Sequence, residues 1–98
     1  MEVFTNLVSS SWPVVVLFYA DWCNSCKALF PVLVQVKSYH ENAVKVVKVD
    51  VEKNRELVAN YSVQSIPTIL IFKEGKQVWR RSGVIDADEL NKILDMFK

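Results

Sequence analysis

The chemistry that this sequence offers lies in two cysteines, Cys23 and Cys26, which are separated by two residues. Such a pair admits three interpretations: half of a metal site, a structural disulfide, or a redox-active dithiol. A closed zinc site takes about four Cys or His ligands, and beyond the pair the chain offers only His40, in a polar segment. A disulfide across two residues closes a very small loop and stabilises a fold little. The redox interpretation is therefore favoured, with no metal and no cofactor expected.

Thiol–disulfide exchange places demands on the surroundings of both sulfurs. The thiolate is the attacking species, so one thiol needs a lowered pKa, and the second must lie close enough to resolve the mixed disulfide. The start of a helix meets these demands, because its unpaired N–H groups and positive dipole end stabilise an anion. With Cys23 at or just before the first helical turn, Cys23 would attack, and the more buried Cys26 would act second.

The elements around the pair predict such a helix start. Val14 to Tyr19 is a continuous run of β-branched and aromatic residues, which is typical of a strand covered on both faces. A helix is predicted over Lys27 to Tyr39, with Asn24 or Ser25 as its N-cap. Its apolar residues at helical spacing are Leu29, Phe30, Leu33 and Val36. The cysteine pair therefore lies where a strand turns into a helix.

The rest of the chain completes an alternating pattern. It predicts a second, parallel strand, a short helix, a hairpin, a closing helix and a brief N-terminal helix. The second strand spans Val44 to Val51, the short helix Asn54 to Tyr61, and the hairpin Thr68 to Phe72 with Gln77 to Ser82. The closing helix starts with a capping box at Asp86, and the N-terminal helix spans Glu2 to Ser9. The predicted fold is α/β: a mixed four-stranded sheet in the order β-α-β-α-β-β-α, with helices on both faces, as one domain over residues 1–98.

Composition and charge exclude several classes of function. The formal charge is +1 and the basic residues are scattered, so no nucleic-acid or anionic-membrane partner is expected. The longest uncharged apolar stretch, Trp12 to Ala20, is far shorter than the roughly 20 residues of a membrane-spanning helix. Glu2 stands where a secretory signal would carry positive charge. We expect a cytoplasmic monomer, with export as the alternative if a leader has been removed.

Five features, taken together, give the sequence a family resemblance. The cysteines stand in Trp22-Cys23-Asn24-Ser25-Cys26, followed forty residues later by Ile66-Pro67-Thr68. The hairpin Phe72 to Gly75, Pro31 in the predicted helix, and Gly83 complete the set. In this order and at this spacing, the sequence resembles the thioredoxin family across nearly its whole length.

The resemblance implies a role for each matching residue. Cys23 would be the attacking cysteine, Cys26 the resolving one, and Pro67 a cis-proline facing the pair. Ile66 would pair its backbone with an extended substrate segment, a form of strand addition. Together with Trp22 and Gly83, these two loop residues would line a shallow apolar groove. The implied partners are protein disulfide substrates and an electron donor similar to thioredoxin reductase.

The sequence departs from the family pattern at two places. Asn24-Ser25 replaces the usual Gly-Pro between the cysteines, so these two residues are expected to tune the redox potential, in the direction of a more oxidising pair. Leu17 and Val46 stand where the family usually carries a buried acid and its lysine partner. Two alternatives therefore stay open: a disulfide oxidant or isomerase in an exported setting, and a binding module with idle cysteines.

Overall fold

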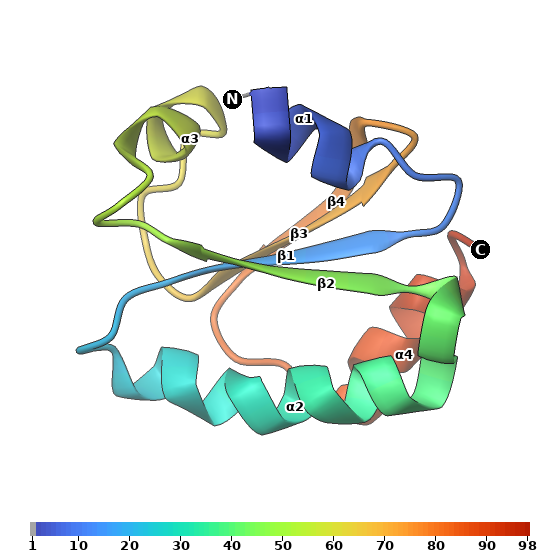
Figure 1. Cartoon of the computed structure of the whole chain (residues 1–98). Helices are drawn as coiled ribbons and strands as arrows, with labels where there is room; N and C mark the ends of the chain where they lie inside the picture. The colour runs from blue at the N-terminus through green and yellow to red at the C-terminus, as the bar shows by residue number, and fades with distance from the viewer. Residues whose placement is uncertain (1) are drawn as a thin grey trace.

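The computed structural model describes residues 2–98, with side chains from Val3 onward, and has the predicted order of elements (Figure 1). The elements are α1 (Glu2–Val8), β1 (Val14–Tyr19), α2 (Asn24–His40), the 3-10 turn η1 (Glu41–Ala43), β2 (Lys45–Asp50), α3 (Arg55–Asn60), β3 (Thr68–Lys73), β4 (Lys76–Ser82) and α4 (Ala87–Asp95). The predicted α/β arrangement with an N-terminal helix is thereby confirmed.

The four strands form one mixed sheet in the order β2-β1-β3-β4. Strand β1 pairs parallel with β2, as expected for two strands joined through a helix, and antiparallel with β3. The hairpin of β3 and β4 turns at Glu74-Gly75. The amides of these two residues donate to the carbonyls of Ser10 and Val8, so the hairpin turn is attached to the end of α1 and to the segment that follows it.

Helices cover both faces of the sheet, as predicted: α2 and α4 lie on one face, and α1 and α3 on the other (Figure 1). The alternation of side chains along β1 explains its continuous apolar run. Val15 and Leu17 join the core beneath α2 and α4, whereas Val14, Val16 and Phe18 join the core beneath α1 and α3. All five are fully buried, so both faces of this strand need apolar residues.

The end of α2 differs from the sequence-based expectation. The sequence places His40 in a polar segment, but His40 is the last residue of α2 and only 4% of its surface is exposed. Its ring contacts the Tyr39 ring edge-on and lies near Asp95 of α4, with the Nδ1 and Oδ1 atoms 3.8 Å apart. The prediction failed because the histidine is set inward by α4, whose position the local sequence does not reveal.

Candidate active site

Cys23 occupies the junction between the end of β1 and the start of α2. Its amide donates to the Ala20 carbonyl (3.1 Å), which closes a turn, and its own carbonyl accepts from the Lys27 amide (3.2 Å) as the first bond of the helix. Cys23 has extended backbone angles and is itself the N-cap residue, so the prediction of Asn24 or Ser25 as N-cap was wrong. The helix begins at Asn24, three residues before the predicted start. The prediction missed this start because the capping atom is a cysteine sulfur and not the Ser, Thr, Asp or Asn oxygen that usually marks an N-cap.

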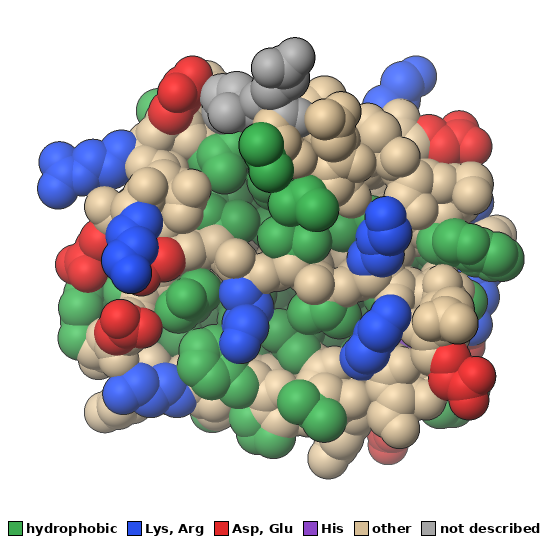
Figure 2. Space-filling model, viewed as in Figure 1, with side chains coloured by type: hydrophobic (Ala, Val, Ile, Leu, Met, Phe, Trp, Pro, Cys, Tyr) green, Lys and Arg blue, Asp and Glu red, His purple; other side chains and the backbone are tan. Residues whose placement is uncertain are grey.

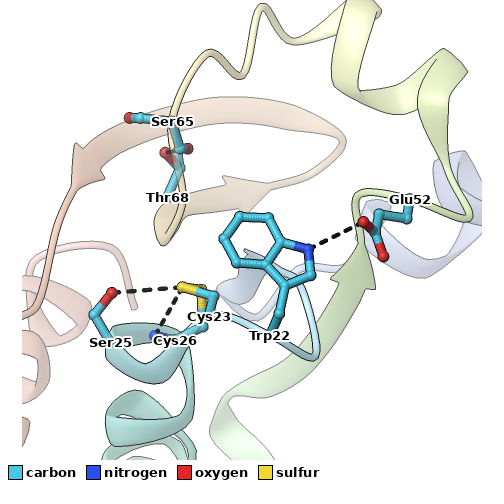
Figure 3. The surroundings of a disulfide bond; sticks show 7 residues. All are labelled: Trp22, Cys23, Ser25, Cys26, Glu52, Ser65 and Thr68. Carbon is cyan, nitrogen blue, oxygen red and sulfur yellow. Dashed lines mark hydrogen bonds between the residues drawn. A yellow bond between two sulfur atoms is a disulfide. The ribbon is translucent and has the colours of Figure 1, made fainter.

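The two sulfurs are joined in a disulfide, with the Cα atoms 5.3 Å apart. Cys23 is 6% exposed and Cys26 is fully buried. The Cys26 amide donates to the Cys23 sulfur (3.2 Å), and the Ser25 hydroxyl lies 3.4 Å from the same sulfur (Figure 3). The first turn of α2 contains no acidic residue. A negative charge on the Cys23 sulfur would thus be met by hydrogen-bond donors and by the positive end of a helix.

The proline loop packs against the cysteine pair. The Ile66–Pro67 peptide bond is cis, as the resemblance implied, and Ile66 contacts the cluster formed by Ala20 and the two cysteines. The Pro67 carbonyl accepts from the Gly83 amide (2.9 Å), which ties the loop to the residue that follows β4.

Thr68 fastens the same loop a second time. Its hydroxyl donates to the Ser65 carbonyl (2.7 Å) and lies 3.1 Å from the Ser82 hydroxyl of β4; Figure 3 shows Thr68 beside Ser65. Across residues 2–98, by contrast, the Ile66 backbone makes no hydrogen bond. The loop is therefore held from both sides while its Ile66 N–H and C=O stay available to an incoming chain.

Beside the disulfide, Trp22 and Ile66 line a shallow apolar hollow of about 210 Å³. The remaining lining residues are Val51, Val58, Val63, Gln64 and Ser65. Pro67 and Gly83 do not line it: Pro67 is buried and Gly83 is half-buried. The four residues expected to form one groove are thus divided between this hollow and the hydrogen-bonded pair of Pro67 and Gly83.

The orientation of Trp22 depends on a residue that sequence reasoning missed. The Trp22 side chain is 66% exposed, and its indole N–H donates to the Glu52 carboxylate (3.0 Å; Figure 3). Glu52 follows β2 as Trp22 follows β1, and parallel neighbours bring the residues after their carboxyl ends together. Trp22 and Glu52 are thirty residues apart along the chain, so the sequence could have revealed their contact only through the predicted pairing of the two strands.

Neither of the two intervening residues is buried. Asn24 and Ser25 are both exposed, and of the two only Ser25 contacts a cysteine sulfur.

Within residues 2–98, no group of three or more His, Cys, Asp or Glu side chains is placed to hold a metal ion. None of the helices over the same residues is both long enough and apolar enough to cross a membrane.

A dithiol–disulfide pair at a helix start, facing a cis-proline loop on a mixed sheet, defines a thiol–disulfide oxidoreductase. The thioredoxin family model matches residues 1–96. A thioredoxin-like protein of Synechocystis is 41% identical over 93% of this chain and 87% of its own length, and thioredoxin 1 of Synechococcus elongatus is 37% identical over 92% and 84%. The structure of a mutant thioredoxin from Halobacterium salinarum superimposes with a TM-score of 0.89 at 31% identity, over 99% of this chain and 84% of that one. The chain belongs to the thioredoxin family.

Proposed function

We propose that this oxidoreductase acts mainly as a reductant of protein disulfides, with Cys23 as the attacking residue. The Cys23 thiolate would displace one sulfur of the substrate disulfide and form a mixed disulfide. The Cys26 thiol then loses its proton to water or substrate, attacks the Cys23 sulfur and releases the second substrate thiol. Two electrons pass to the substrate, which becomes a dithiol, while Cys23 and Cys26 become the disulfide.

The observation that carries this proposal is the difference between the two sulfurs. The Cys23 sulfur is partly accessible and receives the Cys26 amide and the Ser25 hydroxyl, whereas Cys26 is fully buried. A bulky disulfide can reach only the sulfur that is also stabilised as an anion. The order of attack follows from this asymmetry.

Ile66 and Trp22 are proposed to hold the substrate during the exchange. The free backbone N–H and C=O of Ile66 would pair with an extended segment, and the hollow shared with Trp22 would take an apolar side chain next to the half-cystine. Pro67 and Gly83 act on the loop itself, because their mutual hydrogen bond fixes where Ile66 stands. The proposed electron donor is a thioredoxin-reductase-like enzyme, and the proposed setting is the cytoplasm, with the protein as a monomer.

Replacement of the resolving cysteine tests the order of attack. A Cys26→Ser variant mixed with a disulfide-containing peptide should accumulate the mixed disulfide on Cys23, detected as an added mass that dithiothreitol removes. Cys23→Ser is the matched control and should accumulate far less adduct, because its remaining sulfur is buried. Equal adduct on both variants would show that burial does not decide which cysteine attacks.

One contact favours a second candidate function, net oxidation of substrates. A hydroxyl that donates to the Cys23 thiolate stabilises the reduced form and therefore raises the potential of the pair, and Ser25 is placed to do this. Equilibration with glutathione buffers measures the potential directly. A value at or below the roughly −270 mV of thioredoxin would support the reductant and discard the oxidant, whereas a higher value that falls in a Ser25→Ala variant would support the oxidant.

A further inference from the structure

The outer edge of β2 is open and lies away from the cysteine pair. Within residues 2–98, strand β2 is an edge of the sheet and β1 is its one neighbour. The Lys45 amide donates to the Pro13 carbonyl (3.0 Å) and the Val51 amide to the Tyr19 carbonyl (2.9 Å), so the odd-numbered residues of β2 bond to β1. In a parallel pair the alternate residues point the other way. The N–H and C=O groups of Val46 and Lys48 therefore face outward.

A hollow adjoins this edge on each face of the sheet. On the α2 face, a cavity of about 450 Å³ is almost wholly apolar, and Val34 on its wall is 69% exposed. Its other lining residues are Phe30, Leu33, Lys37, Ser38, Val46 and Lys48. On the α1 and α3 face, a cavity of about 380 Å³ is more polar, and its charged lining residues among those described are Lys48, Lys53, Arg55 and Glu56.

The charges around the edge are predominantly positive and form no ion pair among the side chains that the structure describes. Lys45 lies on the α1 and α3 face by the alternation of the strand, and Lys45, Lys53 and Arg55 take no part in an ion pair with any side chain of residues 3–98. Lys37 donates to a backbone carbonyl, and Lys48 lies over the Phe30 ring. Figure 2 shows this side of the molecule, with Lys and Arg side chains standing among hydrophobic patches.

We propose that the β2 edge binds an extended segment of another protein in which apolar and acidic side chains alternate. The segment would add a strand beyond β2 through the outward groups of Val46 and Lys48. Because side chains of a strand alternate between faces, its apolar residues would enter the hollow beside Val34, and its acidic residues would face Lys45 and Lys53.

The lysines argue for this partner over a second copy of the chain. Two β2 edges paired with one another would gather Lys45 and Lys48 of both copies along one seam, where the like charges repel one another. Lysines on an edge strand commonly serve to prevent such self-pairing. An acidic strand converts the same charges into attraction, so the edge that rejects its own copy accepts a complementary segment.

The experiment uses a defined probe, an acetylated and amidated octapeptide of alternating Val and Glu, titrated into the full chain. Binding is followed by fluorescence anisotropy of a labelled peptide and by backbone amide chemical shifts. We expect the largest shifts at Val46 and Lys48, with slowed amide exchange at both, and none at Trp22 or Cys23. Shifts centred on the cysteine pair would overturn the proposal.

Charge-reversed variants test whether the β2 edge selects acidic side chains. Lys45→Glu with Lys53→Glu should weaken the Val-Glu peptide about tenfold and should create binding of a Val-Lys peptide that the unmodified chain rejects. Lys73→Glu with Lys76→Glu, in the β3–β4 hairpin two and three strands away from β2, makes the same change in net charge and should leave binding within about twofold. Equal weakening by both pairs would reduce the effect to net charge and overturn the proposed site.

Val34→Asp tests the apolar half of the site without touching the strand, and Met96→Asp is its matched control at another exposed apolar residue. We expect at least tenfold loss of peptide binding for the first and no loss for the second. Sedimentation of the unmodified chain completes the test. Dimerisation accompanied by protection of the Val46 and Lys48 amides would assign the edge to a second copy and overturn the proposal.

Discussion

At the scale of single residues, the sulfur of Cys23 has the surroundings of an anion-binding site. The Cys26 amide and the Ser25 hydroxyl both approach it, and it caps a seventeen-residue helix. We therefore expect alkylation of the reduced protein to show a lower pKa for the Cys23 thiol than for free cysteine. Iodoacetamide labelling rates across pH 4 to 10 measure this property. A profile identical to that of free cysteine would remove the physical basis of the proposed mechanism.

Ser25 should contribute a measurable part of that acidity. Ser25→Ala removes one hydrogen-bond donor from a partly exposed sulfur, and we expect Cys23 alkylation near neutral pH to slow about threefold. Asn24→Ala is the matched control, because Asn24 is exposed and contacts neither sulfur. Slowing of the same size in both variants would attribute the effect to the dipeptide in general rather than to the hydroxyl.

Leu17 bears on the second half of the reaction, in which Cys26 must lose a proton. Leu17 is fully buried on the face of the sheet that α2 covers, so no carboxylate is supplied there. We expect Leu17→Asp to speed release of substrate from Cys23 and to cost about 1–3 kcal/mol of stability for a buried polar group. The lifetime of the mixed disulfide, measured by acid quench and mass spectrometry, checks the rate.

Leu17→Asn is the control for this change. Asparagine has nearly the same shape as aspartate, but it has no carboxylate that could accept a proton. Faster release in Asp but not in Asn supports proton transfer as the slow event. If the two variants resolve at the same rate while remaining folded, proton transfer from Cys26 does not limit turnover.

At the scale of elements, the C-terminus of α2 carries an unfavourable backbone conformation. Glu41, the C-cap residue, has φ of 52° and ψ of −123°, a region that glycine adopts far more readily than other residues. We expect Glu41→Gly to raise the free energy of unfolding by about 1 kcal/mol. Urea denaturation measures the change. Glu41→Ala removes the same charge but keeps the Cβ atom, so equal effects of Gly and Ala would exclude a backbone origin.

The contact between α2 and α4 should make stability depend on pH through His40. Burial, and secondarily the Lys98 ammonium, lower the pKa of His40 below 6.5, and Asp95 and Asn91 offset part of this. The Tyr39 ring contacts the His40 ring edge-on. The folded state thus binds the proton less readily than the unfolded chain. The contribution of neutral His40 to the free energy of unfolding is therefore fully present above pH 6.5. It is lost as the pH falls from 6.5 towards the folded pKa.

Urea unfolding at pH 7.5 and at pH 5.5 measures this dependence, in a range where most carboxylates stay ionised. A His40→Gln variant should be less stable at the higher pH but should lose less on acidification. A loss on acidification that is undiminished in the variant would place its origin in other groups.

At the scale of the whole molecule, the pattern of apolar residues predicted the fold well. Val14 to Tyr19 must be buried on both faces, and a strand of that kind, followed by a helix and a valine-rich strand, leaves few arrangements open. The site was predicted from the spacing of Cys23 and Cys26, and the cis bond before Pro67 from the resemblance alone. Contacts between side chains that lie far apart along the chain could not be predicted from the sequence. The bond from Trp22 to Glu52 depends on which strands are neighbours, which no local pattern encodes.

The sheet also separates two cores, and only one of them contains α2. Phe4 of α1 packs against Tyr61 and Phe72 on the other face, with ring centroids 5.6 Å away in both contacts. We expect Phe4→Ala to lower the free energy of unfolding by about 3–5 kcal/mol and to leave the Cys23 alkylation rate of the folded protein unchanged. Circular dichroism melts and labelling of the same sample measure both. A change in Cys23 reactivity would mean that the two cores are coupled through the sheet.

Cys23 and Cys26 are the only cysteines among these 98 residues, and each is nearly or fully buried. Within this span every thiol that a blocking reagent labels therefore belongs to this pair. A reagent applied to a freshly acidified extract, followed by denaturation, would add two labels to the dithiol form, one to a mixed disulfide with substrate and none to the disulfide form. The proportions of these three masses count how many copies were reduced, engaged with substrate or oxidised at the moment of sampling.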